Sequence, residues 1–395
     1  MTRKIRILFL PKWYPHKYDP MPGIFVQQQA EALTPHCDVA VIYVHPDPYC
    51  PNKYEAEFSE ENEVRVLRVY YKVTGNSTSF VGKVLSWWRF YRANMKAVHS
   101  IRQFSPDLVH AHVLSRMGYI ALKVSRKQHV PLVISEHWSR YFPENNTYKG
   151  WMRKLITAYI VKKASLVIAV SEPLKLAMQK LHLDNPNFRV VPNVVDHEIF
   201  TAHPSFSENP LKTMVHISCF EDKSKNISGF LDAVRELSGQ RKDFRCLLIG
   251  DGPDRDSMIA YAASLGILDT FVSFTGLKTG AALAGIIGEA DFTVMSSKYE
   301  TFGTVVIESL SCGTPVVATS VGVAQDVVND ANGLLVSPGD QHALTLALDR
   351  MLDQCRSYNR AAIHADLSGK FNKETVGKQL ADLYSKLIPE HSLTQ

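Results

Sequence analysis

The sequence lacks the long apolar run that a membrane-spanning helix requires. Nowhere in the 395 residues does an uninterrupted apolar stretch approach the roughly 18 to 20 residues needed to cross a bilayer. The segment from Thr2 to Lys12 holds only five clearly apolar residues, which is too few for the core of a signal peptide. We therefore expect a globular cytoplasmic protein.

Cysteine is scarce, and its spacing excludes further classes of protein. The six cysteines contain no Cys-x-x-Cys pair, so neither a zinc site nor a disulfide framework is expected. They are Cys37, Cys50, Cys219, Cys246, Cys312 and Cys355. No cluster of metal ligands stands out, and no Gly-x-Gly-x-x-Gly turn follows the first apolar run, which disfavours a dinucleotide-binding fold. We expect no metal and no cofactor.

Acidic residues are few in the first half of the chain. Residues 1–200 carry 27 Lys/Arg against 16 Asp/Glu, whereas residues 201–395 carry 17 against 23, so the net charge of +5 hides an asymmetry. A basic half favours anionic partners such as phosphates or a membrane surface, although it is also compatible with a solvated basic face. Nucleic acid is not among the partners we expect.

Short apolar runs separated by helical patterns occur in two successive sets. The expected strands of the first set are 7–10, 39–44, 107–113, 130–135, 165–170 and 189–192, and those of the second are 213–218, 245–250, 271–275, 291–296, 315–318 and 333–336. Helical patterns lie between them at 25–33, 81–104, 226–237, 281–289 and 342–352. Apolar strands alternating with helices indicate parallel sheets covered on both faces.

The predicted fold class is therefore α/β, with two doubly wound, Rossmann-like domains facing a cleft. The chain is too long for one typical core. We expect an N-terminal domain over residues 1–202, a linker over 203–210 and a C-terminal domain over 211–395. The linker contains Pro, Ser and Asn without an apolar period. The terminal helices can pack back on the first domain.

The strongest local signal is a pair of acids, Glu300 and Glu308, around the start of an expected helix. The strand 291–296 ends before Glu300, and the helix is expected to begin near Gly303 and Thr304 and to end at Gly313. Free N–H groups at a helix start can bind a pyrophosphate. Glu308 lies one turn inside the helix, where its carboxylate could accept hydrogen bonds from both hydroxyls of a ribose. The alternative is two ordinary helix-cap acids.

This acidic block resembles the E-x7-E element of retaining glycosyltransferases of family 4, which have the GT-B fold. Further similar segments follow in the family's order: Gly250–Pro253, Phe274–Gly276, Pro192–Asp196 and Asn332–Leu335. The resemblance implies that Glu308 holds the nucleotide ribose and that Glu300 contacts the donor sugar. It implies that the backbone of Gly303 to Val305 binds the donor phosphates and that Phe302 lies among the donor-binding residues. It implies further that residues 1–202 form an acceptor-binding domain and residues 211–395 a nucleotide-sugar-binding domain. It also implies transfer with retention and without a bound metal.

Similar enzymes place an arginine after the first strand of the second domain and a lysine about five residues later. Here Cys219 occupies the arginine position, and Lys225 matches the lysine better than Lys223 does. A fixed cation at this place would stabilise the charge that develops on the leaving diphosphate. A solvent-facing lysine at the start of a helix is the alternative.

Two residues of the first half complete the expected site. Gly23 ends a long aromatic loop that resembles the family's glycine loop near the donor phosphate, although an ordinary strand-to-helix turn would look the same. His137 follows the strand 130–135, and similar enzymes place a histidine there beside the donor sugar. His110 and His112 alternate along one strand, so we expect structural or acceptor-side roles for them.

The segment Val81–Phe104 is a candidate membrane contact. Val84, Trp87 and Trp88 begin an apolar stripe at helical spacing, which Tyr91, Met95, Val98 and Ile101 continue. Five basic residues and no acid share the segment: Lys83, Arg89, Arg92, Lys96 and Arg102. A basic helix of this kind can lie on an anionic bilayer. The alternative is the core face of a packed helix.

The sequence thus predicts a retaining, metal-independent glycosyltransferase that moves a sugar from a UDP- or GDP-sugar to a glycan or lipid-linked acceptor. Its expected place is the cytoplasm, as a peripheral protein on the inner face of the membrane. The predicted catalytic residues are His137 and Glu300, and the donor-binding residues are Gly23, Lys225, Phe302, Gly303, Thr304, Val305 and Glu308. A nucleotide-sugar epimerase of similar fold and a non-catalytic nucleotide-sugar-binding protein remain as alternatives.

Overall fold

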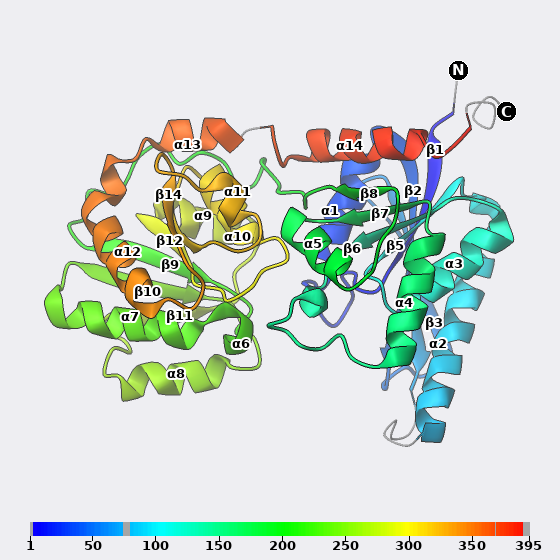
Figure 1. The fold of residues 1–395 in the computed structure, drawn as a ribbon, viewed down its shortest axis with the longest axis horizontal. Coiled ribbons are helices and arrows are strands. Elements are labelled where there is room, and N and C mark those ends of the chain that lie inside the picture. The colour runs from blue at the N-terminus through cyan, green and yellow to red at the C-terminus, as the bar shows by residue number, and fades with distance from the viewer. Residues whose placement is uncertain (1–2, 74–79, 368, 390–395) are drawn as a thin grey trace. The chain divides into compact units, whose positions relative to one another are not determined.

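The computed structural model describes residues 3–73, 80–367 and 369–389, which form two compact units (Figure 1). The first unit comprises residues 1–138, 148–194 and 373–395, and the second comprises residues 139–147 and 195–372. Among the described residues, no helix is long and apolar enough to cross a membrane.

The sheet of the first unit has eight strands in the order β3-β4-β2-β1-β5-β6-β7-β8. These are β1 (Ile5–Pro11), β2 (Cys37–Asp47), β3 (Tyr54–Glu61), β4 (Val64–Lys72), β5 (Leu108–His112), β6 (Leu132–Glu136), β7 (Leu166–Ala169) and β8 (Phe188–Val190). Every pairing is parallel except that of β3 with β4. The central strands are fully buried, as expected for a sheet that helices cover on both faces.

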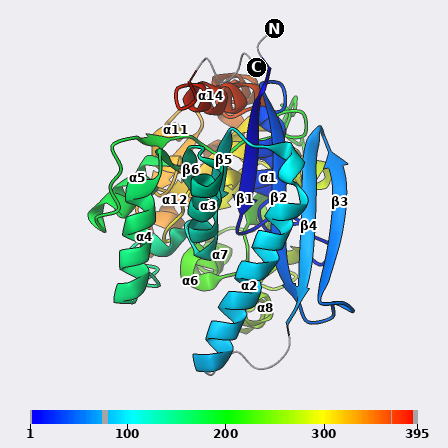
Figure 2. The ribbon, with the colours of Figure 1, turned by 90° about the vertical axis from the view of Figure 1, so that its right-hand side faces the viewer.

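The helices of the first unit connect these strands, and one returns from the end of the chain (Figure 2). They are α1 (Ile24–Leu33), α2 (Phe80–Ser100), α3 (Arg116–Gln128), α4 (Trp151–Lys163), α5 (Glu172–Lys180), α14 (Lys373–Ser385) and the short η1 (Arg102–Phe104). Val376, Leu380 and Tyr384 of α14 share a core with Val26 and Leu33 of α1. The last helix is therefore part of the first unit.

The sheet of the second unit has six strands in the order β11-β10-β9-β12-β13-β14, all parallel. They are β9 (Lys212–Ile217), β10 (Phe244–Ile249), β11 (Val272–Gly276), β12 (Phe292–Met295), β13 (Val316–Thr319) and β14 (Gly333–Val336). The helices are α6 (Asp222–Lys225), α7 (Ile227–Gln240), α8 (Arg255–Ser264), α9 (Gly280–Glu289), α10 (Thr304–Ser311), α11 (Ala324–Val327), α12 (Gln341–Gln354) and α13 (Arg360–Leu367), with short η2 (Ser139–Tyr141) and η3 (Cys355–Ser357).

The predicted fold class, α/β with two parallel-sheet halves, is confirmed, but the chain divides differently from the prediction. Residues 139–147 already belong to the second unit, the main crossing lies between Val194 and Val195 and not at residue 202, and residues 203–210 are part of the second unit. His203 shows why, since its N–H donates to the Cys312 carbonyl at 3.0 Å. Composition marked this segment as irregular but could not show that its backbone is held by packing.

The β3–β4 hairpin was not predicted. Its turn contains Asn62 and Glu63 with φ of 48° and 65°, a pair of left-handed residues typical of a tight hairpin. The side chains of β3 alternate between half-buried and exposed, so this edge strand has no continuous apolar run of the kind used to find the buried strands.

Candidate functional site

The acidic pair of the second unit flanks a helix start, as the sequence predicted. β12 ends at Met295, and α10 begins at Thr304 with Gly303 as its N-cap at φ 87° and ψ 52°. Glycine adopts this left-handed conformation without steric cost. The first N–H groups of a helix have no partner within the helix and carry the positive end of its dipole. This turn can therefore accept an anionic group.

Glu300 and Lys225 form an ion pair in the loops beside this helix start. Lys225 Nζ donates to Glu300 Oε1 at 2.5 Å, and Ser297 Oγ donates to the same oxygen at 2.8 Å. The two charged side chains are only 18% and 12% exposed. Burial opposes the charged ammonium, but the Glu300 carboxylate and nearby acidic groups outweigh it, so the pKa of Lys225 is raised. Lys225 therefore stays charged near neutral pH.

Backbone contacts bring Lys225 to this place. Lys298 N–H donates to the Ser224 carbonyl at 2.8 Å, which joins the loop after β12 to α6. The Ser296 hydroxyl donates to the Lys225 carbonyl at 2.9 Å. Lys223 points elsewhere and donates to the Asn145 carbonyl at 2.9 Å. Of the two lysines, Lys225, which the sequence analysis preferred, is thus the one that pairs with Glu300.

Glu308 lies inside α10 and is partly buried. Within the described chain, its carboxylate has no hydrogen-bond or ion-pair partner. Burial raises the pKa of Glu308 to about 7. A partly buried acid without a partner is costly for a folded protein. Such an acid is, however, able to accept hydrogen bonds from a ligand.

Two further positions from the sequence analysis, Phe302 and Cys219, offer no charged side chain to a donor. The side chain of Phe302, predicted to bind the donor, is 2% exposed and packs 6.0 Å from the Phe371 ring, so it belongs to the core of the second unit. Its carbonyl accepts the Val323 N–H at 2.7 Å. Cys219 is exposed at the position of the expected arginine, so it adds no positive charge to the loop after β9.

Gly23 in the first unit is the N-cap of α1, with φ 76° and ψ 16°. A Cβ atom at this position would collide with the Trp13 carbonyl. The loop from Pro11 therefore lies directly against the start of α1, which only glycine permits. The prediction that this loop approaches the donor phosphate is not tested by this geometry.

His137 follows β6 and is 7% exposed. Its Nε2 lies 3.4 Å from Nδ1 of His112, and its ring lies 4.4 Å from that of Phe25. Its own Nδ1 is buried without a hydrogen-bond partner in the described part of the chain. Burial lowers the pKa of His137 to about 3, more than the neighbouring Asn193 raises it. The imidazole is therefore neutral and has an unsatisfied nitrogen.

Glu136, which the sequence analysis missed, organises this turn. One carboxylate oxygen accepts the N–H groups of His137 and Trp138 at 2.9 Å each, and the other accepts that of Leu114 at 2.9 Å. Its exposure is 0%. The sequence did contain a signal for this residue, namely an acid directly between an apolar strand and a histidine. A carboxylate buried at such a place must accept several hydrogen bonds, so it can be expected to hold the turn together.

His110 has a structural position. Its Nε2 lies 2.8 Å from Ser135 Oγ, and Tyr384 OH lies 2.8 Å from its Nδ1. Both side chains are fully buried. The histidine thereby links β5 to the returning helix α14, which agrees with the structural role expected for it.

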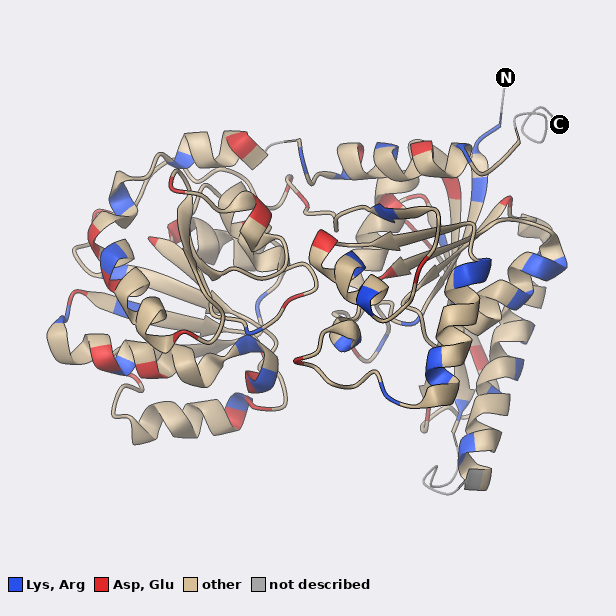
Figure 3. Ribbon diagram, in the orientation of Figure 1, with Lys and Arg blue, Asp and Glu red and all other residues tan. Residues whose placement is uncertain are grey.

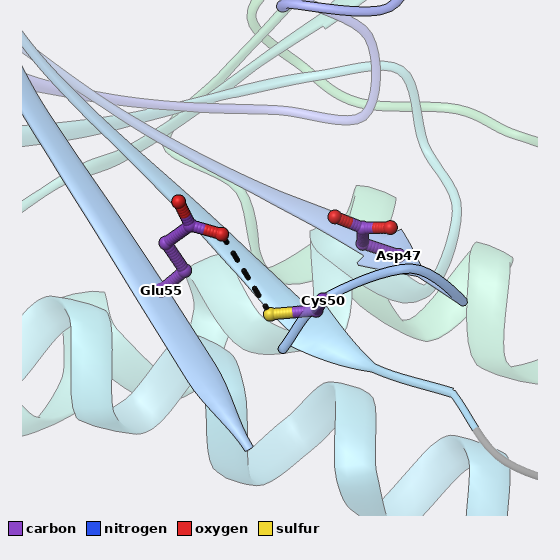
Figure 4. Close-up of side chains that lie close together, drawn as sticks. All are labelled: Asp47, Cys50 and Glu55. Atoms are coloured by element: carbon purple, nitrogen blue, oxygen red, sulfur yellow. Dashed lines mark hydrogen bonds between the residues drawn. The ribbon is translucent and has the colours of Figure 1, made fainter. Parts of the chain in front are cut away.

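One group of described side chains has metal-ligand chemistry, and it lies in the first unit. Asp47 at the end of β2, Cys50 in the following loop and Glu55 on β3 place ligand atoms within 4.8 Å of one another (Figure 4). Tyr18 OH donates to Asp47 at 2.7 Å, and Lys17 Nζ lies 3.4 Å from Glu55 and 3.9 Å from Asp47. The carboxylates of Asp47 and Glu55 therefore already have partners within the protein, namely the Tyr18 hydroxyl and the Lys17 ammonium.

The one Asp-x-Asp spacing of the sequence, Asp254 and Asp256, lies at the start of α8. Asp254 accepts the Asp222 N–H at 2.8 Å, which joins α6 to this helix, and Asp256 faces Arg255 at 3.5 Å. Both acids therefore have structural partners.

Family models match both halves of the chain. The model described as Glycosyltransferase Family 4 matches residues 23–199, and that described as Glycosyl transferases group 1 matches residues 202–366. The 2-deoxystreptamine glucosyltransferase of Streptomyces kanamyceticus is 27% identical over 75% of this chain and 80% of its own. The putative teichuronic acid biosynthesis glycosyltransferase TuaC of Bacillus subtilis is 24% identical over 88% of this chain and 89% of its own.

Solved structures share the fold over nearly the whole length. Sucrose-phosphate synthase from Thermosynechococcus elongatus superposes with a TM-score of 0.77 at 20% identity, covering 98% of this chain and 99% of its own. Anabaena HepE, solved with UDP and glucose, gives a TM-score of 0.72 at 18% identity, covering 97% of this chain and 100% of its own. The chain therefore belongs to the family 4 and group 1 glycosyltransferases and has their GT-B fold.

Proposed function

We propose that the protein transfers a sugar from a nucleotide-diphosphate sugar to a glycan or lipid-linked acceptor, with retention of configuration and without a bound metal. The observation that supports this most is the arrangement around α10: a helix start capped by Gly303, the Lys225–Glu300 pair, and Glu308, which has no partner among the described residues. Each group matches one part of a nucleotide sugar.

Glu308 is assigned to the ribose. A ribose diol offers two hydroxyl donors to the two oxygens of a carboxylate, and such charge-assisted hydrogen bonds are stronger than neutral ones. The N–H groups of Gly303, Thr304 and Val305 are assigned to the diphosphate, because a helix start favours anions. Donor binding would then satisfy a partly buried carboxylate that has no described partner.

Lys225 is assigned to the leaving diphosphate. Negative charge grows on the phosphate oxygen as the glycosidic bond breaks, and a fixed cation lowers the energy of that transition state. Glu300 holds the ammonium in place and keeps it charged. Beyond the phosphate, the carboxylate of Glu300 can also contact a hydroxyl of the donor sugar.

His137 is assigned to the donor sugar as a neutral hydrogen-bonding group. With its pKa lowered to about 3, it does not act as a general acid near neutral pH. Its unpartnered Nδ1 can exchange a hydrogen bond with a sugar hydroxyl. The base for the incoming acceptor would then be the departing phosphate, which agrees with retention without a pair of carboxylates suited to double displacement.

UDP is the nucleotide to test first, because the HepE structure contains UDP. The name of TuaC refers to teichuronic acid biosynthesis, which supports a glycan or lipid-linked acceptor. Such an acceptor would place the enzyme in the cytoplasm at the inner face of the membrane. The non-catalytic alternative is supported by the exposed Cys219 at the position of the family's arginine.

The test combines binding and turnover. The protein is titrated with UDP, GDP and ADP by calorimetry, and the release of nucleotide from the matching UDP-, GDP- or ADP-sugar is then measured with and without glycan acceptors. Wild type and the exposed control Glu289→Gln should bind one nucleotide and turn over its sugar. Binding without any release of nucleotide would favour the non-catalytic alternative. Failure to bind all three nucleotides would contradict the proposal.

A further inference from the structure

Three helices of the first unit carry positive charge without any acid. Helices α2, α3 and α4 each contain four Lys/Arg and no Asp/Glu. The whole chain is nearly balanced, with 44 basic and 39 acidic residues, so this concentration is local. Figure 3 shows the basic segments along these three helices.

Helix α2 does not bury the apolar stripe that its sequence presents. Its fully buried positions are the small or polar Ala93, Asn94 and Ala97. Val84 is 52% exposed and Trp88 is 47% exposed. The stripe is therefore not simply the core face of a packed helix, and large apolar side chains lie beside the basic ones on the surface.

Helix α4 shows the same combination, which the sequence analysis did not detect. All six residues from Trp151 to Ile156 are exposed. Trp151 is 76% exposed and Leu155 is 62% exposed, while Arg153 and Lys154 lie between them. A large exposed apolar group of this kind marks an interaction surface.

Contacts between side chains join the three helices into one face. The rings of Trp87 on α2 and Tyr119 on α3 lie 5.9 Å apart. Arg126 on α3 donates to the hydroxyl of Tyr159 on α4 at 2.8 Å. The exposed apolar residues of α2 and α4 therefore border a shared basic surface.

A groove with a volume of about 1070 Å³ lies between α2 and α3 on this face. Its lining includes six cations and no acid: Arg92, Lys96, Arg102, Lys123, Arg126 and Lys127. Apolar residues and two tyrosines also line it, with Lys96 Nζ 4.6 Å from the Tyr54 ring and Lys123 Nζ 4.7 Å from the Tyr91 ring. Such a groove fits anionic phosphate groups.

We propose that the face formed by α2, α3 and α4 docks on an anionic lipid bilayer, with lipid phosphates in the α2–α3 groove and the exposed residues of α2 and α4 in the interfacial layer. Basic residues near an anionic surface contribute about 1 kcal/mol each, and tryptophan and leucine add apolar burial. This inference rests on the proposed function and extends it, because a protein docked on the bilayer could reach an acceptor that is anchored there by a lipid.

Other partners fit this face less well. A second copy of the chain would bring two faces of like charge together, which is unfavourable. A nucleic acid would neutralise the cations but would leave Trp151, Leu155 and Val84 without an apolar partner. An anionic bilayer matches both the charge and the exposed apolar side chains.

The test is sedimentation of the full chain with vesicles of phosphatidylglycerol and phosphatidylcholine, or of phosphatidylcholine alone, at low and high salt. We expect binding to the anionic vesicles that falls as salt rises. Arg102→Gln with Lys127→Gln should weaken this binding about 30-fold, the equivalent of about 1 kcal/mol for each charge. Trp151→Ser with Leu155→Ser should weaken it at both salt concentrations.

Matched controls separate charge at this face from net charge. Lys378→Gln with Lys386→Gln removes two exposed charges, one on α14 and one directly after it, and should bind as wild type does. Arg102→Lys with Lys127→Arg keeps the charge and should also bind. Circular dichroism checks the fold of each variant, and UDP affinity measured on the same samples should stay unchanged.

Several outcomes would overturn the inference. These are no vesicle binding at low salt, an equal loss in the α14 control, equal binding to both kinds of vesicle, or a preference for an oligonucleotide. A change of molecular mass in the Trp151 and Leu155 variant alone would point to a second copy of the chain. If the wild-type protein bound vesicles but not UDP, the proposed function would be contradicted while the inference about membrane docking would still hold.

Discussion

The loops around α10 and the turn after β6 belong to different units, and their key side chains differ in charge. Around α10, Lys225 and Glu300 form an ion pair that raises the pKa of Lys225, and Glu308 has no described partner. After β6, His137 is buried and neutral. The second unit thus holds a charged pair beside a helix start, while the turn after β6 in the first unit holds a neutral imidazole. The proposal assigns the ion pair to the diphosphate and the imidazole to the donor sugar, so each assignment can be tested by its own variant.

Removal of the cation should have the largest effect. Lys225→Ala takes away the charge assigned to the leaving diphosphate and leaves Glu300 without its partner. We expect kcat to fall by about 100-fold to 1000-fold, the usual range for the loss of one electrostatic contact to a transition state. Lys223→Ala is the matched control. Equal losses in the two variants would show that position 225 has no special role.

The neutral side of the comparison is tested at His137. His137→Ala should lower kcat more than it changes UDP affinity, because the residue is assigned to the sugar and not to the nucleotide. A loss of about 10-fold to 100-fold is expected for one hydrogen bond made in the transition state. Since its pKa is about 3, the variant should keep the shape of the wild-type pH profile between pH 6 and 8. Removal of a limb of that profile would contradict the neutral assignment.

Glu300→Gln tests the paired carboxylate at nearly constant size. It weakens the support for Lys225 and the contact with the donor sugar but leaves the ribose site intact. We expect a clear loss of turnover with little change in UDP affinity. Weak UDP binding together with normal turnover would contradict this placement.

Glu308 should show opposite effects on binding and on stability. Glu308→Gln should weaken UDP binding by about 1.5–3 kcal/mol, because it removes a charged acceptor. With a folded pKa of about 7, the wild-type acid is progressively protonated below that pH, so its UDP affinity should fall from pH 8 to pH 6. The variant should lack that slope.

The same raised pKa has a stability consequence. The folded acid retains its proton up to about pH 7, whereas the unfolded acid loses it near pH 4.5. The contribution of this group to the stability of the ligand-free protein is therefore lost as pH rises through that window. Glu308→Gln should raise the melting temperature at pH 8 but not at pH 4. A lower melting temperature at pH 8 would contradict an uncompensated carboxylate.

Treatment with EDTA should have the smallest effect. If Lys225 and the helix N–H groups neutralise the charge of the donor phosphates, no metal ion is needed and activity should survive excess chelator. The measurement is turnover before and after EDTA, with Mg²⁺ or Mn²⁺ restored afterwards. Loss of activity that either ion restores would show that the donor site is different from the one proposed.

How much the sequence could predict differs between the two units. The strand and helix around Glu300 and Glu308 were predicted because an apolar strand, a glycine and an apolar helix are consecutive in the chain. The Lys225–Glu300 contact joins residues 75 positions apart, and no local pattern reports such a distance. The sequence preferred Lys225 to Lys223 only through the resemblance to similar enzymes, and it could not show this contact.

The turn after β6 was harder to predict in detail. Glu136 reaches Leu114 across 22 positions, and the neutrality of His137 comes from burial that the whole unit produces. Phe302 was assigned to the donor from its neighbours, but its side chain packs inside the second unit, because exposure is decided by what packs around a residue. The polar edge strand β3 was missed because its pattern differs from that of a buried strand.

By itself, the sequence determined the two α/β halves, the helix start at Gly303, the position of the acidic pair and the basic character of the first half, because these follow from local periodicity, glycine and charge. Only the tertiary structure decided the return of α14 to the first unit, the pairing of Lys225, the lack of a described partner for Glu308 and the exposed face of α2, α3 and α4. Burial and partnership depend on contacts between distant segments, and it is burial that sets the pKa of Glu308 and of His137.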